Sequence, residues 1–228
     1  LSGKVWRSVD DGLTWSDISA NLTSTEPFKH LYALAIATGG RVLAAGIYGF
    51  YYTDNFGDTW TQNTGWASPA NLTQLVATYA MSTFLLGAEY TRMNSTAAGV
   101  GAPTLVYTSG TADQVKGIGV HSAGALVVSI TAATSASGNP RLLSSGNSVT
   151  WANISARIPG AITSAGSAVA QAGSGTWLLG FANGKIARST DNTATFTDIS
   201  ASAPFGANPI TGITAFTLPD DVIDLIAT

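Results

Sequence analysis

The chain has 228 residues and a net charge of −3, and only 10% of its residues are charged although 45% are hydrophobic. This balance excludes the basic surface that nucleic acids require, and no apolar run approaches the length of a membrane span, so we expect neither a nucleic-acid partner nor membrane insertion. The absence of Cys excludes disulfides, thiol nucleophiles and Cys-type zinc sites, and the two His lie in unrelated segments, so we expect no metal or other cofactor.

Short apolar runs bounded by Gly, Pro and Asn recur along the chain and predict an all-β protein. Each pair of runs reads as a hairpin, and the near-uniform lengths favour strands buried on both faces. The expected hairpins are 31–37 with 41–47, 75–80 with 83–88, 117–121 with 125–130, 162–170 with 177–181, and 210–216 with 222–227. The first residue is Leu1 rather than Met, from which we expect a processed product or an excised domain.

An eight-residue pattern, Ser-x-Asp-x-Gly-x-Thr-Trp, recurs between these hairpins. Its residues are Ser8, Asp10, Gly12, Thr14 and Trp15 in the first copy; Thr53, Asn55, Gly57, Thr59 and Trp60 in the second; Ser144, Thr150 and Trp151 in the fourth; and Ser189, Asp191, Thr195 and Phe196 in the fifth. The third copy, placed at 95–99, has lost both the Asp and the aromatic residue. The Asp can accept backbone N–H bonds across a tight turn, Gly supplies a positive φ, and the aromatic ring starts the outgoing strand.

The spacing of the copies is regular. Their first positions fall at residues 8, 53, 95, 144 and 189, and the distance from the last copy through the C-terminus back to the first is 47 residues. A unit of about 40–45 residues is what a four-stranded propeller blade needs.

The recurring pattern resembles the Asp-box (BNR-repeat) motif of β-propellers such as sialidases, sortilin-type receptors, xyloglucan-cleaving enzymes and photosystem assembly factors. The resemblance implies a single domain, a five-bladed β-propeller of four-stranded antiparallel blades. The predicted blades are 210–228 with 1–20, 30–64, 74–109, 115–155 and 161–200.

One of these blades is shared between the two ends of the chain. Residues 177–188 align with 222–228 followed directly by 1–7, so the C-terminus has the sequence of two inner strands and the N-terminus that of two outer ones. We therefore predict that Val222–Ala227 pairs with Lys4–Ser8 and closes the ring, which leaves no open sheet edge.

The pattern residues are interpreted as scaffold, because in propellers these turns face away from the usual ligand entrance. Ligands bind the opposite loops. Five side chains on those loops are candidate ligand-binding residues because aromatic rings stack on sugars and charged groups bind hydroxyls or carboxylates: Tyr48, Trp66, Glu89, Tyr90 and Arg141.

The favoured function is a non-enzymatic recognition or structural module, a glycan- or receptor-binding or assembly propeller. The partner would be a glycan, a cell-surface receptor or neighbouring subunits. The Ser/Thr/Ala/Gly-rich composition resembles phage tail, virion and bacterial extracellular proteins, so the expected location is a virion or a cell exterior.

Two alternatives stay open. A sialidase-like glycoside hydrolase would need an arginine triad and facing carboxylates, but the only Glu residues are Glu26 and Glu89, and the Arg157-Ile158-Pro159 sequence follows a repeat instead of preceding the first. An intracellular assembly factor is the second alternative.

Overall fold

The computed structural model describes residues 4–19, 22, 31–37, 39–46, 49–63, 76–80, 83–88, 92–97, 104–108, 114–121, 127–132, 141–173, 175–202, 205–217 and 223–227. These residues form antiparallel strands and two short 3-10 helices, η2 (Ser155–Arg157) and η3 (Ser200–Ser202), with no α-helix among them. No helix in this part of the chain is long and apolar enough to cross a membrane.

Sixteen of the strands form four sheets, each of four strands that pair in chain order. The first sheet contains β3 (Leu31–Ile36), β4 (Val42–Gly46), β5 (Gly49–Thr53) and β6 (Thr61–Asn63). The second contains β7 (Val76–Ala80), β8 (Thr83–Ala88), β9 (Arg92–Ala97) and β10 (Thr104–Thr108). The third contains β11 (Gln114–Val120), β12 (Val127–Ala132), β13 (Arg141–Ser145) and β14 (Ala152–Asn153). The fourth contains β15 (Gly166–Ala172), β16 (Thr176–Phe181), β17 (Ile186–Ser189) and β18 (Thr197–Asp198).

The remaining described strands form two sheets of two strands each. At the start of the chain β1 (Trp6–Arg7) pairs with β2 (Ser16–Asp17), and at its end β19 (Ile213–Thr217) pairs with β20 (Ile223–Ala227). We call these the N-terminal pair and the C-terminal hairpin.

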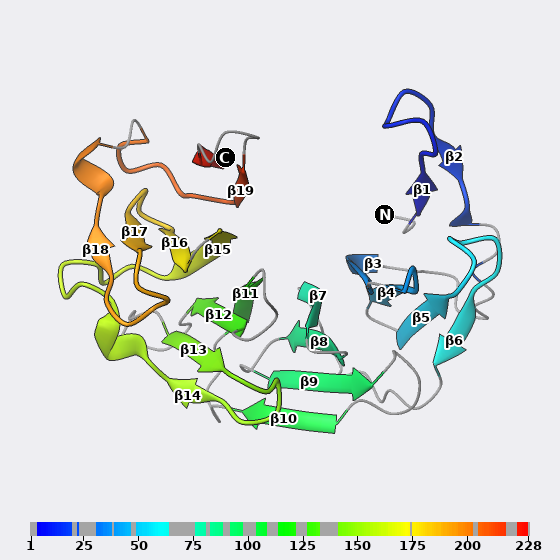
Figure 1. Cartoon of the computed structure of the whole chain (residues 1–228), viewed down its shortest axis with the longest axis horizontal. Helices are drawn as coiled ribbons and strands as arrows, with labels where there is room; N and C mark the ends of the chain where they lie inside the picture. The colour runs from blue at the N-terminus through cyan, green and yellow to red at the C-terminus, as the bar shows by residue number, and fades with distance from the viewer. Residues whose placement is uncertain are drawn as a thin grey trace.

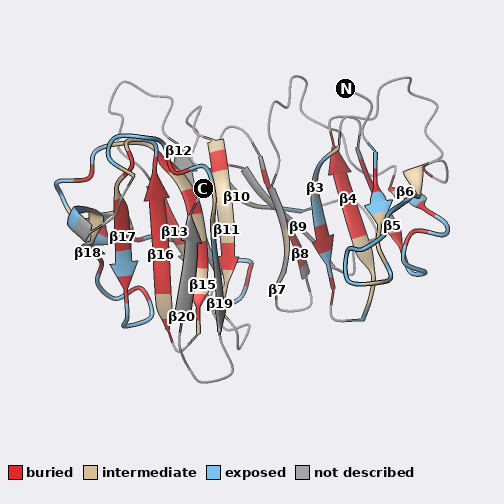
Figure 2. Cartoon of the chain, turned by 90° about the horizontal axis from the view of Figure 1, so that it is seen from above, coloured by how far each residue is buried: buried red, intermediate tan, exposed pale blue. Residues whose placement is uncertain are grey.

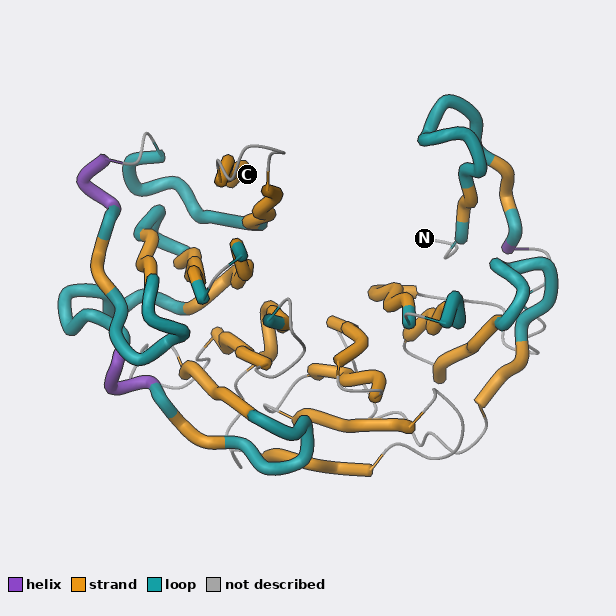
Figure 3. The backbone as a smooth tube through the Cα atoms, in the orientation of Figure 1, coloured by secondary structure: helices purple, strands orange, loops and turns teal. Residues whose placement is uncertain are grey.

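The sheets stand side by side along an open arc, with the first strand of each four-stranded sheet on the inside and the fourth on the outside (Figure 1). Neighbouring inner strands touch in the sequence β3, β7, β11, β15 and β19. The N-terminal pair and the C-terminal hairpin lie at the two ends of the arc, on either side of its opening, as the backbone trace also shows (Figure 3).

The core lies between neighbouring sheets. One cluster joins the third and fourth four-stranded sheets through Leu142, Ile154, Trp177 and Phe196, and the central strands β4 and β16 are mostly buried (Figure 2). The sheets approach closely because small residues face large ones: a Cβ on Gly119 would lie 2.7 Å from the Trp177 ring.

The five hairpins predicted from the apolar runs are confirmed as strand pairs, but some bounds differ: β15 begins at Gly166 rather than at Ile162, and β11 begins at Gln114 rather than at Gly117. The expectation that their strands are buried on both faces is wrong for β3, where Tyr32, Leu34 and Ile36 are exposed. The predicted pairing of the two chain ends is not formed in this structure, since β1 pairs with β2 and β20 with β19, in separate sheets.

Candidate functional site

The first recurring turn is held by a network of short polar bonds. The Ser8 hydroxyl donates to Asp10 Oδ1 at 2.8 Å and accepts the N–H of Gly12 at 2.8 Å. The Asp10 carboxylate in turn accepts the N–H of Thr14 at 2.8 Å and its hydroxyl at 2.5 Å. Positive φ angles at Asp11 and Gly12, 56° and 87°, turn the chain between these bonds.

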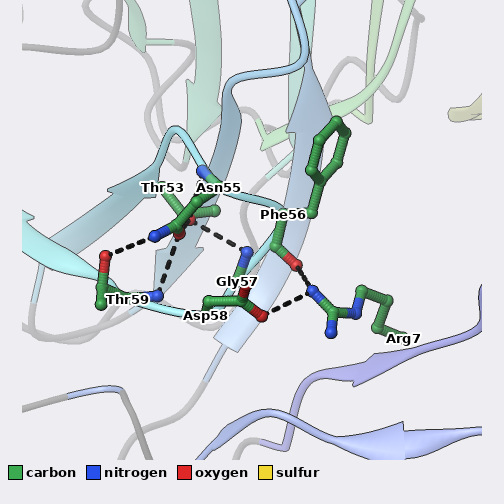
Figure 4. A network of polar contacts seen from close by, with 7 residues as sticks. All are labelled: Arg7, Thr53, Asn55, Phe56, Gly57, Asp58 and Thr59. Atoms are coloured by element: carbon green, nitrogen blue, oxygen red, sulfur yellow. Dashed lines mark hydrogen bonds and ion pairs between the residues drawn. The ribbon is translucent and has the colours of Figure 1, made fainter.

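The second turn repeats this geometry with an amide in place of the carboxylate (Figure 4). Thr53 Oγ1 accepts the N–H of Gly57 at 3.0 Å, and Asn55 Oδ1 accepts the N–H of Thr59 at 3.0 Å. The Asn55 side-chain N–H donates to Thr59 Oγ1 at 2.9 Å, so the direction of that bond is reversed relative to the Asp turns.

The last turn matches the first. Ser189 Oγ accepts the N–H of Thr193 at 2.9 Å, and Asp191 accepts both the N–H and the hydroxyl of Thr195 at 2.9 and 2.5 Å. The Thr195 bonds, followed by that from Ser189, lower the pKa of Asp191 to about 2. The same bonds from Thr14 and Ser8 lower the pKa of Asp10. Both carboxylates are therefore ionised acceptors at neutral pH.

The fourth copy starts at a different residue from the predicted one, and the predicted start of the third lies within a strand. In the fourth, Ser145 rather than Ser144 takes the position of Ser8: it bonds Asn147, whose Oδ1 accepts the Thr150 N–H at 2.8 Å. This turn is one residue shorter than the first. In the third, Ser95 lies inside β9, paired with both Leu85 and Thr104, and Ala97 is the last residue of that strand.

A second motif, Asp/Asn-Ile-Ser, recurs just after three of the turns, at 17–19, 153–155 and 198–200. Each Ser hydroxyl accepts a backbone N–H from the preceding strand or, for Val5, from the residue just before it: Ser19 from Val5, Ser155 from Leu142 and Ser200 from Ile186, at 2.7, 2.9 and 3.0 Å. The Asp or Asn accepts the N–H of the same Ser at 2.8–2.9 Å. The motif therefore extends the pairing of the two outer strands.

Two arginines tie neighbouring sheets together. Arg7 donates to the Phe56 carbonyl at 2.9 Å and to Asp58 Oδ1 at 2.8 Å, which joins the N-terminal pair to the second turn (Figure 4). Arg157 donates to the Thr193 carbonyl at 3.0 Å, which joins η2 to the last turn. Arg157, the first residue of the Arg157-Ile158-Pro159 sequence considered for a sialidase, thus makes a contact between sheets. No pattern in the sequence indicates the role of Arg7.

Of the five predicted ligand-binding residues, Tyr48, Trp66, Glu89 and Tyr90 lie outside the described residues, so their grouping stays a prediction. Arg141 begins β13, where it is half-buried and pairs with Thr131. Two further loops are expected on the same face, because they also connect the second strand of a blade to the third or one blade to the next, and their residues 182–185 and 205–209 are described. A Cβ on Gly184 would lie 2.2 Å from the Gly206 carbonyl oxygen, so the loops at 182–185 and 205–209 are in direct contact.

The described residues also form an apolar groove of about 520 Å³ between the N-terminal pair and the sheet β3–β6. Its walls include Trp6 and Trp15 on one side and Leu34, Ile36 and Phe56 on the other. These five side chains are exposed, whereas Trp60 is buried at the edge of the groove. No group of three or more His, Asp or Glu able to hold a metal occurs among the described residues.

Comparison of the sequence with protein-family models and with curated proteins gives no match. Among solved structures, the whole chain is similar to YCF48 bound to a D1 peptide, with 12% identity, a TM-score of 0.68 and 69% of that chain covered. It is also similar over 92% of its length to the GH74 enzyme of Niastella koreensis, with 15% identity and a TM-score of 0.72. A third similar structure is the WD40 β-propeller domain of Doa1, with 13% identity and a TM-score of 0.62, and with 98% of this chain and 68% of that one covered.

These similarities show that the chain has a β-propeller fold. The chain spans 38% of the GH74 enzyme, well under half its length. The fold is therefore shared by a GH74 enzyme, by YCF48 with its bound peptide and by the WD40 domain of Doa1.

Proposed function

We propose that the chain is a non-enzymatic recognition propeller of the Asp-box class. This proposal rests on one observation: the described carboxylates already bond to groups within the fold. Asp10 and Asp191 are committed to hydrogen bonds within separate turns, while Asp17, Asp54 and Asp198 pair with Lys4, Arg41 and Lys185. A glycosidase needs two carboxyl groups that face each other across a substrate, one of them protonated. The bonds that lower the pKa of Asp10 and Asp191 work against the protonated form.

The proposed propeller has five blades. Four are the four-stranded sheets, and the fifth joins β1 and β2 as outer strands to a hairpin of the β19–β20 type as inner strands, two halves that lie in separate sheets in this structure. The regular recurrence of the turns supports the Asp-box class, because Ser8, Thr53, Ser145 and Ser189 occupy the same place in four hydrogen-bonded turns.

The proposed ligand face is the one that carries Tyr48, Trp66, Glu89, Tyr90 and Arg141, and the proposed ligand is a glycan or receptor at a cell or virion exterior. A peptide ligand is the second candidate for this face, because the similar YCF48 structure has a bound peptide. Stacking at a shallow face gives weak affinity for a single site, so useful binding requires several copies together.

Glycoside hydrolysis is the second candidate function, and the similarity to GH74 enzymes favours it. The predicted face would then need a carboxylate pair, for which Glu89 is the one acid among the predicted residues.

A glycan array with the chain displayed multivalently tests the proposal. We expect binding that is lost in Trp66→Ala and Tyr90→Ala and retained in Val149→Ala, a truncation on a turn at the opposite side. Hydrolysis of a xyloglucan or sialoside substrate would move the chain to the enzyme class. No glycan signal, together with capture of a peptide by the same face, would replace the glycan with a polypeptide ligand.

A further inference from the structure

The groove beside the N-terminal pair exposes a sheet face whose counterpart in the fourth four-stranded sheet is covered by the preceding sheet. Leu34 of β3 pairs with Ala44, as Val169 of β15 pairs with Leu179, so the two side chains occupy the same place on their sheets. Val169 packs against Gly117 and Gly119 of β11, the inner strand of the preceding sheet, within 3.0–3.3 Å of the Cβ positions. Leu34 and Ile36 face the groove instead and are 51% and 67% exposed.

The piece that would cover this surface is the inner hairpin of a blade. The N-terminal pair contributes the outer strands at this position, and β1 has one neighbour, β2, among the described strands. The C-terminal hairpin is the complementary half: an inner pair without outer strands, and the last member of the series of touching inner strands.

The two halves also differ in charge. The first seven residues include Lys4 and Arg7 and no acid, whereas residues 220–228 include Asp220, Asp221 and Asp224 and no base. Because Lys4 already pairs with Asp17 and Arg7 with Asp58, this difference favours the approach of the two halves without forming new ion pairs.

The hairpin of the same chain is fixed far from the groove. It is held on the fourth sheet by Ile210 and Ile213, which approach so closely that a Cβ on Gly180 would lie 2.6 Å from Ile210 Cγ2. With the packing angles of this structure the arc does not return to its start (Figure 1). Bending every sheet contact further would strain close-packed interfaces.

We propose that the groove binds the C-terminal hairpin of a second copy of this chain, with β20 added along the free edge of β1. This inference rests on the shared blade of the proposed function and names the donor of its inner strands. The contact is head-to-tail, so each bound copy presents its own groove to a further copy. Such assembly would supply the several linked sites that weak glycan binding requires.

The full chain, analysed by light scattering over a range of concentrations, tests the proposal. We expect a mass of 23.3 kDa at low concentration that rises to multiples of this value, with a blue shift of Trp fluorescence as Trp6 and Trp15 become buried. Ile36→Asp should weaken association by at least about tenfold, because the docked hairpin would bury an unpaired charge. Val149→Asp, at a similarly exposed position on the fourth turn, should associate like the wild type.

A mass of 23.3 kDa at every concentration would overturn the proposal. In that case, thermal destabilisation by Ile36→Asp would indicate that the chain inserts its own hairpin, and unchanged stability would indicate an unfilled groove. Equal weakening of association by Ile36→Asp and Val149→Asp would place the contact elsewhere. Glycan binding by a chain that stays monomeric would reject the assembly and leave the proposed function intact.

Discussion

The N-terminal pair and the outer half of the fourth four-stranded sheet carry the same local bonds in different surroundings. Lys4 pairs with Asp17 as Lys185 pairs with Asp198, and the Ser8 turn has the bonds of the Ser189 turn. Their aromatic residues differ sharply, however. Trp15 is 58% exposed, whereas Phe196, at the same place in its turn, is 8% exposed. Trp6 is 50% exposed, whereas the equivalent Ala187 is fully buried.

This difference separates two contributions to the stability of a blade, the local turn bonds and the packing against a neighbouring sheet. The turn bonds join residues at most a few positions apart, and they form in the four described turns between outer strands. Burial of the aromatic residue depends on a neighbouring sheet: Phe196 packs with Leu142 and Ile154 of the third sheet. Local sequence thus specifies the turn, and the next sheet supplies the hydrophobic stabilisation.

The largest expected effect on the free energy of unfolding comes from replacing the aromatic residue of each turn. Phe196→Ala should lower the free energy of unfolding by about 3–5 kcal/mol, because it leaves a cavity between two sheets. Trp15→Ala should cost less than about 1 kcal/mol in the monomer, because its ring is mostly in water already. Chemical denaturation at low protein concentration measures both. A large loss in Trp15→Ala would mean that another segment covers the N-terminal pair in solution.

A smaller effect is expected at the turn glycines, where backbone strain and packing can be separated. Gly12 and Gly57 both have positive φ, and a Cβ on Gly12 would meet its nearest atom at 3.9 Å, whereas one on Gly57 would lie 2.2 Å from Ile18 Cδ1. Gly12→Ala should therefore cost only the conformational strain, about 1–2 kcal/mol. Gly57→Ala should cost about 2–4 kcal/mol, because Ile18 must also move. Equal losses in thermal melts would show that the contact with Ile18 relaxes freely.

The smallest expected effect concerns acid stability. The pKa of Asp191 is lowered to about 2 in the folded chain, from an ordinary value of 3.8. Its bonds therefore contribute stability above about pH 4, and this contribution is lost as the pH falls through about 2. Asp191→Asn should lose less stability than the wild type between those pH values in melts recorded at each pH. Asn55, in the second turn, indicates that an amide is accommodated there. Parallel pH profiles for the two proteins would refute this assignment.

Features that depend on neighbouring residues were predictable from the sequence. The hairpins follow from the apolar runs, and the turn bonds follow from the types and spacing of Ser8, Asp10 and Thr14. The fourth turn was misplaced by one residue because 144 and 145 are both Ser. Strand register selects Ser145, which pairs with Val127.

Features that depend on distant segments were not predictable in the same way. Leu34 and Ile36 look like core residues in the sequence, and their exposure depends on what stands before the first four-stranded sheet. Arg7 reaches a turn about fifty positions away, and no local pattern indicates that partner. Of the five candidate ligand-binding residues, the structure describes Arg141 alone, so the aromatic residues remain predictions.

The recurring turns also determine how readily a protease can cleave the native chain. Leu13 is 85% exposed at the tip of the first turn and has the apolar side chain that chymotrypsin-like enzymes select. Cleavage requires an extended stretch of backbone, but the bonds from Ser8 and Asp10 hold Asp11 and Gly12 at positive φ. A protease can therefore cleave beside Leu13 only after the turn has opened locally. The digestion rate at this bond would report the opening of one turn while the rest of the propeller stays folded.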